Sequence, residues 1–93
     1  MVEIIHRNIT VSGKVQGVWF RKFTQERAAI LGVKGWVRNT QEGNVYIEAE
    51  AESSVMEIFL ESVKQGSPLA HVQNMVVEEA PVKYFIAFEI LYT

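Results

Sequence analysis

The sequence contains no cysteine and no aspartate. All eleven acidic residues among its 93 positions are glutamate. Without cysteine, disulfides, thiol nucleophiles and thiolate metal sites are excluded. Without aspartate, an aspartyl-phosphate intermediate, an Asp-based magnesium cluster and an Asp-containing triad are excluded as well. The two histidines, His6 and His71, lie far apart in the chain, so we expect no protein-bound catalytic metal.

Excess charge of one sign and long apolar runs are also lacking. The formal net charge of -2 gives no general attraction to nucleic acid or to an anionic membrane. No apolar run approaches the ~20 residues of a membrane span, and the first ten residues carry charges that do not suit a signal peptide. We therefore expect a cytoplasmic protein with neither a membrane nor a nucleic-acid partner. An apolar share of 48% over 93 residues fits one globular domain, residues 1–93.

The hydrophobic pattern predicts five strands and two helices. Strands are expected at residues 4–11, 33–40, 45–50, 71–82 and 84–91, with a hairpin turn at 41–44. The alternation over residues 45–50 is typical of a strand with one face in water. The element order predicts an α+β, ferredoxin-like split βαβ sandwich (βαββαβ), an antiparallel sheet with both helices on one face, and a further short strand near the end.

Apolar residues at three- and four-residue steps define the two helices. The first is expected over about residues 21–31, ended by Gly32. One face of this helix is expected to carry Phe20, Phe23, Arg27, Ile30 and Leu31. The second is expected to take its N-cap from Ser53-Ser54, with Glu57 three residues after Ser54 as in a capping box, and to be ended by Gly66-Ser67-Pro68. Its stripe consists of Met56, Phe59, Leu60 and Val63.

The stretch SGKVQGVWFR, residues 12–21, joins the first strand to the first helix. Gly13 and Gly17 permit backbone conformations that other residues resist, and we expect Gly17 to be the more constrained. Backbone N–H groups that lead into a helix can form an anion site, to which Arg21 would add a bidentate fork and Lys14 more diffuse charge. From glycine spacing alone, an ordinary strand-to-helix connection is the better interpretation. The spacing matches neither a Walker A loop nor a dinucleotide fingerprint.

Asn39 is an uncharged amide near the end of a predicted strand. Alternation places it on the side of Val37, opposite Trp36 and Arg38. Asparagine at such a position often only shapes a turn, so the residue type alone leaves its role open.

Three segments taken together resemble the acylphosphatase family: SGKVQGVWFRKFTQ, GWVRNTQEGNV and GSPLAHV. The resemblance runs in order from about Ile9 to the end of the chain. It implies a ferredoxin-like hydrolase that cleaves acyl phosphates to carboxylate and inorganic phosphate without metal, cofactor or covalent intermediate. It further implies that Arg21 binds phosphate and that Asn39 orients the attacking water. The backbone cradle it implies comprises Val15, Gln16, Gly17, Val18, Trp19 and Phe20.

Two alternatives remain beside the acyl phosphate hydrolase. The first is a non-catalytic anion-binding or regulatory domain, because a fold does not fix a function. The second is a single-strand RNA binder, in which Trp19 and Phe20 would stack on bases; the acidic residues of 45–52 argue against it. We expect a monomer with a small-molecule substrate, inorganic phosphate as product and inhibitor, and a pocket mouth bordered by Trp19.

Overall fold

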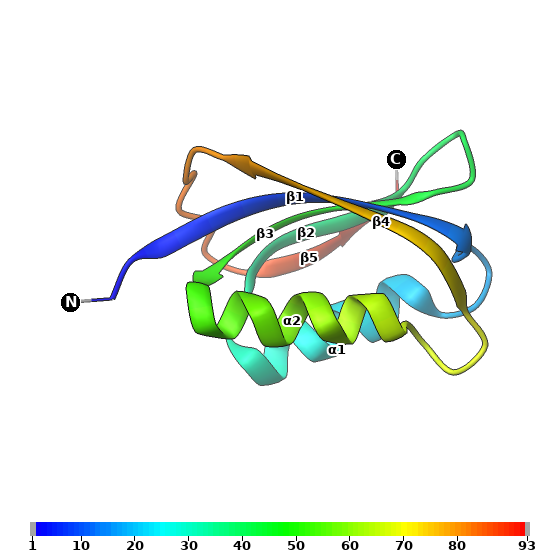
Figure 1. Cartoon of the computed structure of the whole chain (residues 1–93), viewed down its shortest axis with the longest axis horizontal. Coiled ribbons are helices and arrows are strands. Elements are labelled where there is room, and N and C mark those ends of the chain that lie inside the picture. The colour runs from blue at the N-terminus through cyan, green and yellow to red at the C-terminus, as the bar shows by residue number, and fades with distance from the viewer. Residues whose placement is uncertain (1, 93) are drawn as a thin grey trace.

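In the computed structural model, which describes residues 2–92, two helices cover one face of a β-sheet (Figure 1). The elements are β1 (Ile4–Lys14), α1 (Phe20–Leu31), β2 (Lys34–Asn39), β3 (Val45–Glu52), α2 (Ser53–Gln65), β4 (His71–Ala80) and β5 (Phe88–Leu91). The predicted order and the placement of both helices on one face are confirmed. Within residues 2–92, neither helix is long and apolar enough to cross a bilayer.

The strands lie in the order β4-β1-β3-β2-β5. The first four pair antiparallel, as the split βαβ fold requires. The short strand β5 adds a parallel pair at the edge, with Val37 of β2 opposite Ile90, and no feature of the sequence indicated this direction. β5 is also shorter than the predicted strand over 84–91. Residues 81–87 instead cross the face of the sheet that lies opposite the helices.

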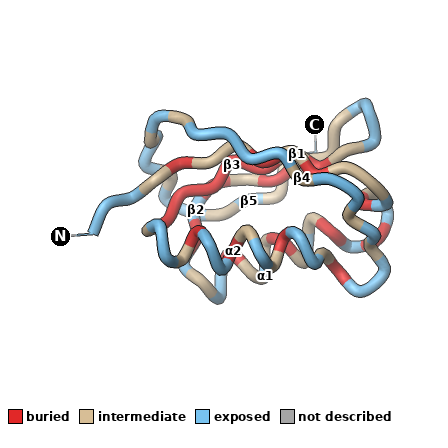
Figure 2. Tube along the Cα trace, in the orientation of Figure 1, coloured by how far each residue is buried: buried red, intermediate tan, exposed pale blue. Residues whose placement is uncertain are grey.

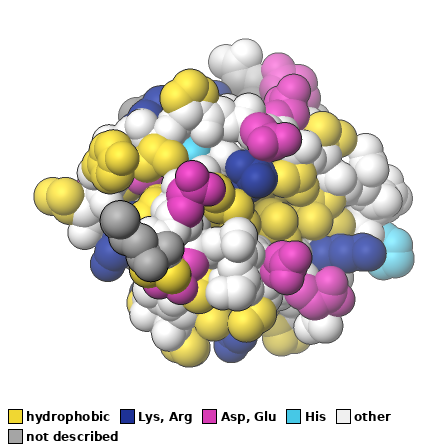
Figure 3. Space-filling model, turned by 60° about the vertical axis from the view of Figure 1, so that its left-hand side comes forward, with side chains coloured by type: hydrophobic (Ala, Val, Ile, Leu, Met, Phe, Trp, Pro, Cys, Tyr) yellow, Lys and Arg dark blue, Asp and Glu magenta, His cyan; other side chains and the backbone are white. Residues whose placement is uncertain are grey.

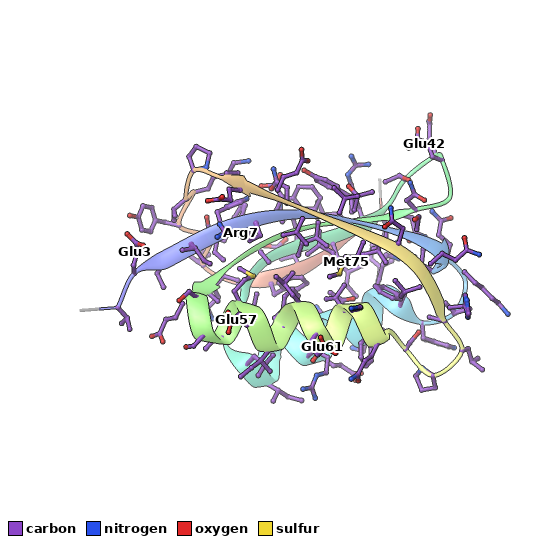
Figure 4. All side chains as sticks on the ribbon, viewed as in Figure 1. Glu3, Arg7, Glu42, Glu57, Glu61 and Met75 are labelled. Carbon is purple, nitrogen blue, oxygen red and sulfur yellow. The ribbon has the colours of Figure 1, made fainter. Side chains whose placement is uncertain are left out.

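The hydrophobic core lies between the sheet and the helices (Figure 2). The buried stripe of α2 is confirmed, since Met56, Phe59 and Val63 are buried. Met75 of β4 points toward the helix layer and packs against this core (Figure 4).

The predicted face of α1 needs one correction. Ile30 is 71% exposed, whereas Thr24 and Ala28 are buried. Thr24 can be buried because its hydroxyl donates a hydrogen bond to the carbonyl of Phe20 at 2.8 Å, so no polar group is left unpaired. A pattern of apolar residues cannot predict the burial of a polar residue whose hydrogen bond is made within its own helix.

The helix ends follow the glycines, but the start of α2 does not follow the predicted cap. Gly32 and Gly66 follow the last residues of α1 and α2 with φ angles of 77° and 75°, which confirms both stops. The predicted N-cap at Ser53-Ser54 is wrong, because both serines already lie within α2. Strand β3 runs directly into α2, Glu52 occupies the N-cap position, and no side chain caps the helix.

The second face of β3 is not in water, contrary to the prediction. Glu48 and Glu50 are only 8% and 3% exposed. The backbone N–H groups of Lys83 and Phe85 donate hydrogen bonds to Glu50, and the Nδ1 atom of His6 lies 2.7 Å from the same carboxylate. The Nζ atom of Lys83 lies 3.0 Å from Glu48. Residues 81–87 therefore cover this face and, together with His6 of β1, supply the partners that allow two carboxylates to be buried.

Acid is expected to weaken the attachment of this crossing segment. Burial raises the pKa of Glu50, but the hydrogen bonds from Lys83, His6 and Phe85 together bring it below its ordinary value of 4.5. The stabilisation is therefore complete above pH 4.5 and is lost as the pH falls through the lowered pKa. We expect Glu50→Gln to lower the free energy of unfolding by about 2 kcal/mol at pH 7. This difference in free energy between the variant and the parent should become smaller at acidic pH.

Urea unfolding of both proteins at several pH values between 7 and 3 measures this difference. Glu42→Gln is the matched control, because Glu42 is exposed at the tip of the β2–β3 hairpin and projects away from the sheet (Figure 4). If the difference in free energy of unfolding between Glu50→Gln and the parent stays constant with pH, the stabilising role of the ionised Glu50 is contradicted.

Candidate active site

A hollow of about 450 Å³ opens where the β1–α1 loop, the first turn of α1 and the ends of β2 and β5 meet. Its lining residues are Val15, Gly17, Trp19, Phe20, Arg21, Lys22, Asn39, Ile90 and Tyr92. The fold thus brings Arg21 and Asn39, which lie on different elements, to one cavity. Four of the six predicted cradle residues also line it. The other two, Gln16 and Val18, do not.

The β1–α1 loop holds an open set of backbone donors. Gly17 and Trp19 adopt left-handed conformations with φ of 71° and 64°, and α1 begins immediately afterwards at Phe20. Among the described residues, no backbone carbonyl accepts a hydrogen bond from the N–H groups of residues 16–19. A turn of this kind can direct successive N–H groups toward one anion, and the helix N-terminus adds partial positive charge.

Two side-chain contacts fix this loop from behind. The Ser67 hydroxyl donates a buried hydrogen bond to the carbonyl of Val18 at 2.7 Å. The Gln16 amide donates to the carbonyls of Thr40 and Asn44 at 2.9 and 2.7 Å. The loop is thereby fastened to the α2–β4 connection and to the hairpin that follows Asn39, so its shape does not depend on a bound ligand. The sequence predicts Ser67 only as part of the Gly66-Ser67-Pro68 stretch that ends α2, and nothing in it indicates the hydrogen bond to Val18.

Gly13, not Gly17, is the most constrained glycine of the stretch. A Cβ added at Gly13 would lie 2.2 Å from the backbone oxygen of His71, whereas one at Gly17 meets nothing within 4 Å. Gly13 differs from Gly17 in two ways: β4 approaches it closely at a register shift in the β1–β4 pairing, and its φ of 122° lies farther from the left-handed region open to other residues than the 71° of Gly17.

We expect Gly13→Ala to lower the free energy of unfolding by more than about 2 kcal/mol. Gly17→Ala should cost only the ~1 kcal/mol of an alanine in a left-handed conformation. Chemical denaturation of both variants measures the difference. An equal decrease in the free energy of unfolding of both variants would contradict the greater constraint at Gly13.

The C-terminal strand orients Arg21. One guanidinium nitrogen, Nη1, donates to the carbonyl of Leu91 at 3.3 Å, and the Cζ atom lies 4.8 Å from the centre of the Tyr92 ring. The side chain is half-buried, so it is held in place while still reaching the hollow. Lys14, by contrast, is exposed at the end of β1 and does not line the cavity.

Asn39 ends β2 on the side of the sheet that faces the helices. The predicted alternation is confirmed: Val37 is in the core, whereas Arg38 lies over the rings of Trp36 and Tyr46 on the other face. The Asn39 Oδ1 atom is buried and has no hydrogen-bond partner among the described residues. An unpaired buried acceptor costs about 1–3 kcal/mol, so this oxygen is suited to accept a hydrogen bond from a bound water or ligand.

Sequence reasoning missed three residues of the hollow: Lys22, Ile90 and Tyr92. Lys22 could have been found, because it follows Arg21 on the first helical turn. The other two could not, because their position depends on the parallel pairing of β5. The lining residues in the described part of the chain include no carboxylate, histidine or hydroxyl nucleophile other than the Tyr92 phenol. The arrangement combines a cation, backbone donors and an amide, which can bind a phosphoryl group and position a water molecule.

Comparison with known proteins agrees with this arrangement. The family model "Acylphosphatase" matches residues 7–90. An acylphosphatase of Archaeoglobus fulgidus is 45% identical over 89 residues, which cover 96% of this chain and 100% of the relative. A crystal structure of acylphosphatase from Bacillus subtilis superposes with a TM-score of 0.92 at 38% identity, covering 95% of this chain and 99% of that one. An acylphosphatase from Coxiella burnetii gives a TM-score of 0.91 at 36% identity, with coverage of 95% and 93%. With a match that spans nearly the whole chain in both sequence and fold, this protein belongs to the acylphosphatase family.

Proposed function

We propose that this protein hydrolyses acyl phosphates by direct in-line attack of water on phosphorus. A bond forms between the water oxygen and phosphorus while the bond from phosphorus to the carboxyl oxygen breaks. The carboxylate leaves with the bonding electron pair, and the water gives up a proton to yield inorganic phosphate. Membership of the acylphosphatase family supports the reaction. The hollow that Arg21 shares with Asn39 is the observation that carries the mechanism.

Arg21 and the loop backbone neutralise the phosphoryl oxygens in this mechanism. Phosphoryl transfer depends mainly on positioning and on stabilising charge on these oxygens. A guanidinium held by Leu91 and Tyr92 is arranged before the substrate arrives, and the N–H groups of residues 16–19 are free of backbone partners among the described residues. Preorganised donors of this kind lower the barrier because they need no rearrangement during the reaction.

Asn39 holds the attacking water in line with the bond that breaks. Its unpaired Oδ1 can accept a hydrogen bond from that water, and positioning alone can lower a barrier by several kcal/mol. A carboxylate is a good leaving group that needs little protonation, so the mechanism requires no strong general acid. It uses no cofactor, metal or covalent intermediate.

The proposal extends to the setting in which the enzyme works. We take it to be a cytoplasmic monomer whose partner is a small acyl phosphate, with inorganic phosphate competing for the same loop. The absence of cysteine supports a compartment in which disulfides are not needed. Figure 3 shows acidic and basic side chains scattered among apolar ones over one face, a distribution that does not favour a nucleic-acid partner.

Hydrolysis of acetyl phosphate and benzoyl phosphate by the purified protein, with a chelator present, tests the proposal. Turnover well above the uncatalysed rate is expected, with competitive inhibition by inorganic phosphate. Phosphate binding without turnover of either substrate would favour the non-catalytic anion-binding domain and overturn the hydrolase.

A further inference from the structure

Ser67 is a buried polar residue that the proposed mechanism does not use. It lies in the connection between α2 and β4 with only 3% of its surface exposed, and it does not line the hollow. Its hydroxyl donates a 2.7 Å hydrogen bond to the carbonyl of Val18, which lies 49 positions earlier in the chain. The contact therefore joins this connection to the middle of the β1–α1 loop.

The α2–β4 connection presents this hydroxyl in a fixed position. Gly66 lies so close to the first residue of α1 that an added Cβ would be 3.1 Å from the ring of Phe20 and 3.2 Å from the Cβ of Ala70. The carbonyl of Ser67 accepts a hydrogen bond from the N–H of Ala70 at 3.0 Å, which closes a turn. Ser67 is thereby held against the start of α1, directly behind the loop.

The bond to Val18 also fixes the direction of the next N–H group. The peptide between Val18 and Trp19 is trans, so the carbonyl of Val18 and the N–H of Trp19 point in opposite directions. Ser67 holds the Val18 carbonyl on the buried side of the loop, and Trp19 borders the hollow. The Trp19 N–H is therefore directed away from Ser67, to the side on which an anion in the hollow can accept a hydrogen bond from it.

The backbone at Trp19 indicates that this peptide orientation needs support from elsewhere in the fold. Its φ angle of 64° is in the left-handed region, which a bulky residue rarely adopts. Turning the Val18–Trp19 peptide over would return φ to a negative value open to every residue, but it would also aim the Val18 carbonyl at the hollow. A carbonyl oxygen there would repel the phosphoryl oxygens. The hydrogen bond from Ser67 opposes this rotation, because the rotation would leave a buried hydroxyl without its acceptor.

We infer that Ser67 is a positioning residue for phosphoryl binding, which holds the Val18–Trp19 peptide with its N–H toward the substrate. This role rests on the proposed function and adds to it a residue outside the hollow. Without the hydroxyl, the chain still folds, but the loop populates a second conformer that binds phosphate poorly. The apparent dissociation constant then rises in inverse proportion to the competent fraction. Saturating substrate draws the loop back to the competent conformer, so KM changes much more than kcat.

The test compares two variants of Ser67 with two controls, using inorganic phosphate as the probe. Ser67→Ala removes the hydroxyl, and Ser67→Thr keeps it. Ser62→Ala removes a different hydroxyl, which donates to the carbonyl of Ile58 within α2 at 3.2 Å. Val63→Ala lowers stability by opening a cavity in the core, at a residue that does not line the hollow. The measurements are KM and kcat for acetyl phosphate, the phosphate inhibition constant, the melting temperature, and the amide proton shift of Trp19 in NMR spectra during phosphate titration.

We expect Ser67→Ala to raise KM and the phosphate inhibition constant by about tenfold while kcat stays within about threefold of the parent. Phosphate should shift the Trp19 amide proton downfield in the parent, and Ser67→Ala should need about tenfold more phosphate for the same shift. Ser67→Thr and Ser62→Ala should behave like the parent in both constants. Val63→Ala should melt at a lower temperature without a change in the inhibition constant.

Three results would overturn the role of Ser67 and leave the hydrolase intact. They are a parental inhibition constant in Ser67→Ala, an equal rise in Val63→Ala, and a Ser67→Thr variant that binds phosphate as weakly as Ser67→Ala. Failure of the parent to hydrolyse acyl phosphates would instead refute the proposed function, while the phosphate titration would still decide on Ser67. A parent that binds no phosphate would refute both.

Discussion

Arg21→Ala is expected to lose at least ~10³-fold in kcat/KM for acyl phosphates together with inhibition by inorganic phosphate. The substitution removes a charge that the Leu91 carbonyl and the Tyr92 ring hold in place at the hollow. Transition-state arginines in phosphoryl transfer contribute about 10³–10⁵ in rate. In the proposed mechanism both substrate and phosphate bind this cation, so their binding should weaken together.

Two matched variants separate the role of Arg21 from general charge effects. Lys14→Ala removes a neighbouring cation that lies outside the hollow and should keep nearly full activity. Arg21→Lys keeps the charge but loses the planar fork, so its activity should fall between those of the parent and Arg21→Ala. Thermal melting of each variant identifies any loss that comes from unfolding. A folded Arg21→Ala that retains activity within tenfold of the parent would refute the assignment.

Asn39→Ala is expected to lose about 10²-fold in kcat while inhibition by inorganic phosphate is unchanged. In the proposed mechanism the amide positions the water and does not hold the phosphoryl group, and misplacing a reacting group by about 1 Å can cost this much. The variant should be as stable as the parent or slightly more stable, because the buried Oδ1 has no partner in the described structure and alanine removes an unpaired acceptor. Loss of activity with retained stability and phosphate binding is the combination that identifies a water-positioning residue.

Steady-state kinetics with phosphate as inhibitor, together with thermal melting, measures all three properties. Gln41→Ala serves as control, because Gln41 is an exposed polar residue of the adjacent turn. Hydrolysis by Asn39→Ala at the parental rate would show that the loop and Arg21 suffice without it. A marked rise in the phosphate inhibition constant would place Asn39 among the phosphate ligands instead.

The sequence predicted the local features of the fold well. Gly32 and Gly66 end the helices, and the stripe of α2 is buried as expected, because such features depend on residues a few positions apart. The pattern misjudged Thr24, Ile30, Glu48 and Glu50, whose burial depends on hydrogen-bond partners or on a covering segment. For Glu50, two of those partners are the backbone N–H groups of Lys83 and Phe85, more than thirty residues away in the chain.

The candidate site divides in the same way. In the sequence, only the resemblance to the acylphosphatase family assigned phosphate binding to Arg21 and water orientation to Asn39. A glycine-bearing loop and a strand-end asparagine are each common by themselves, so the residue types alone left both roles open. Only the tertiary structure decided that Arg21 and Asn39 share one hollow and that Ser67 and Gln16 brace the loop. It also decided that β5, paired parallel to β2, brings Ile90 and Tyr92 to the hollow beside the loop SGKVQGVWFR. Strand direction and long-range contacts depend on how distant segments pack together, and no local pattern in the sequence encodes that packing.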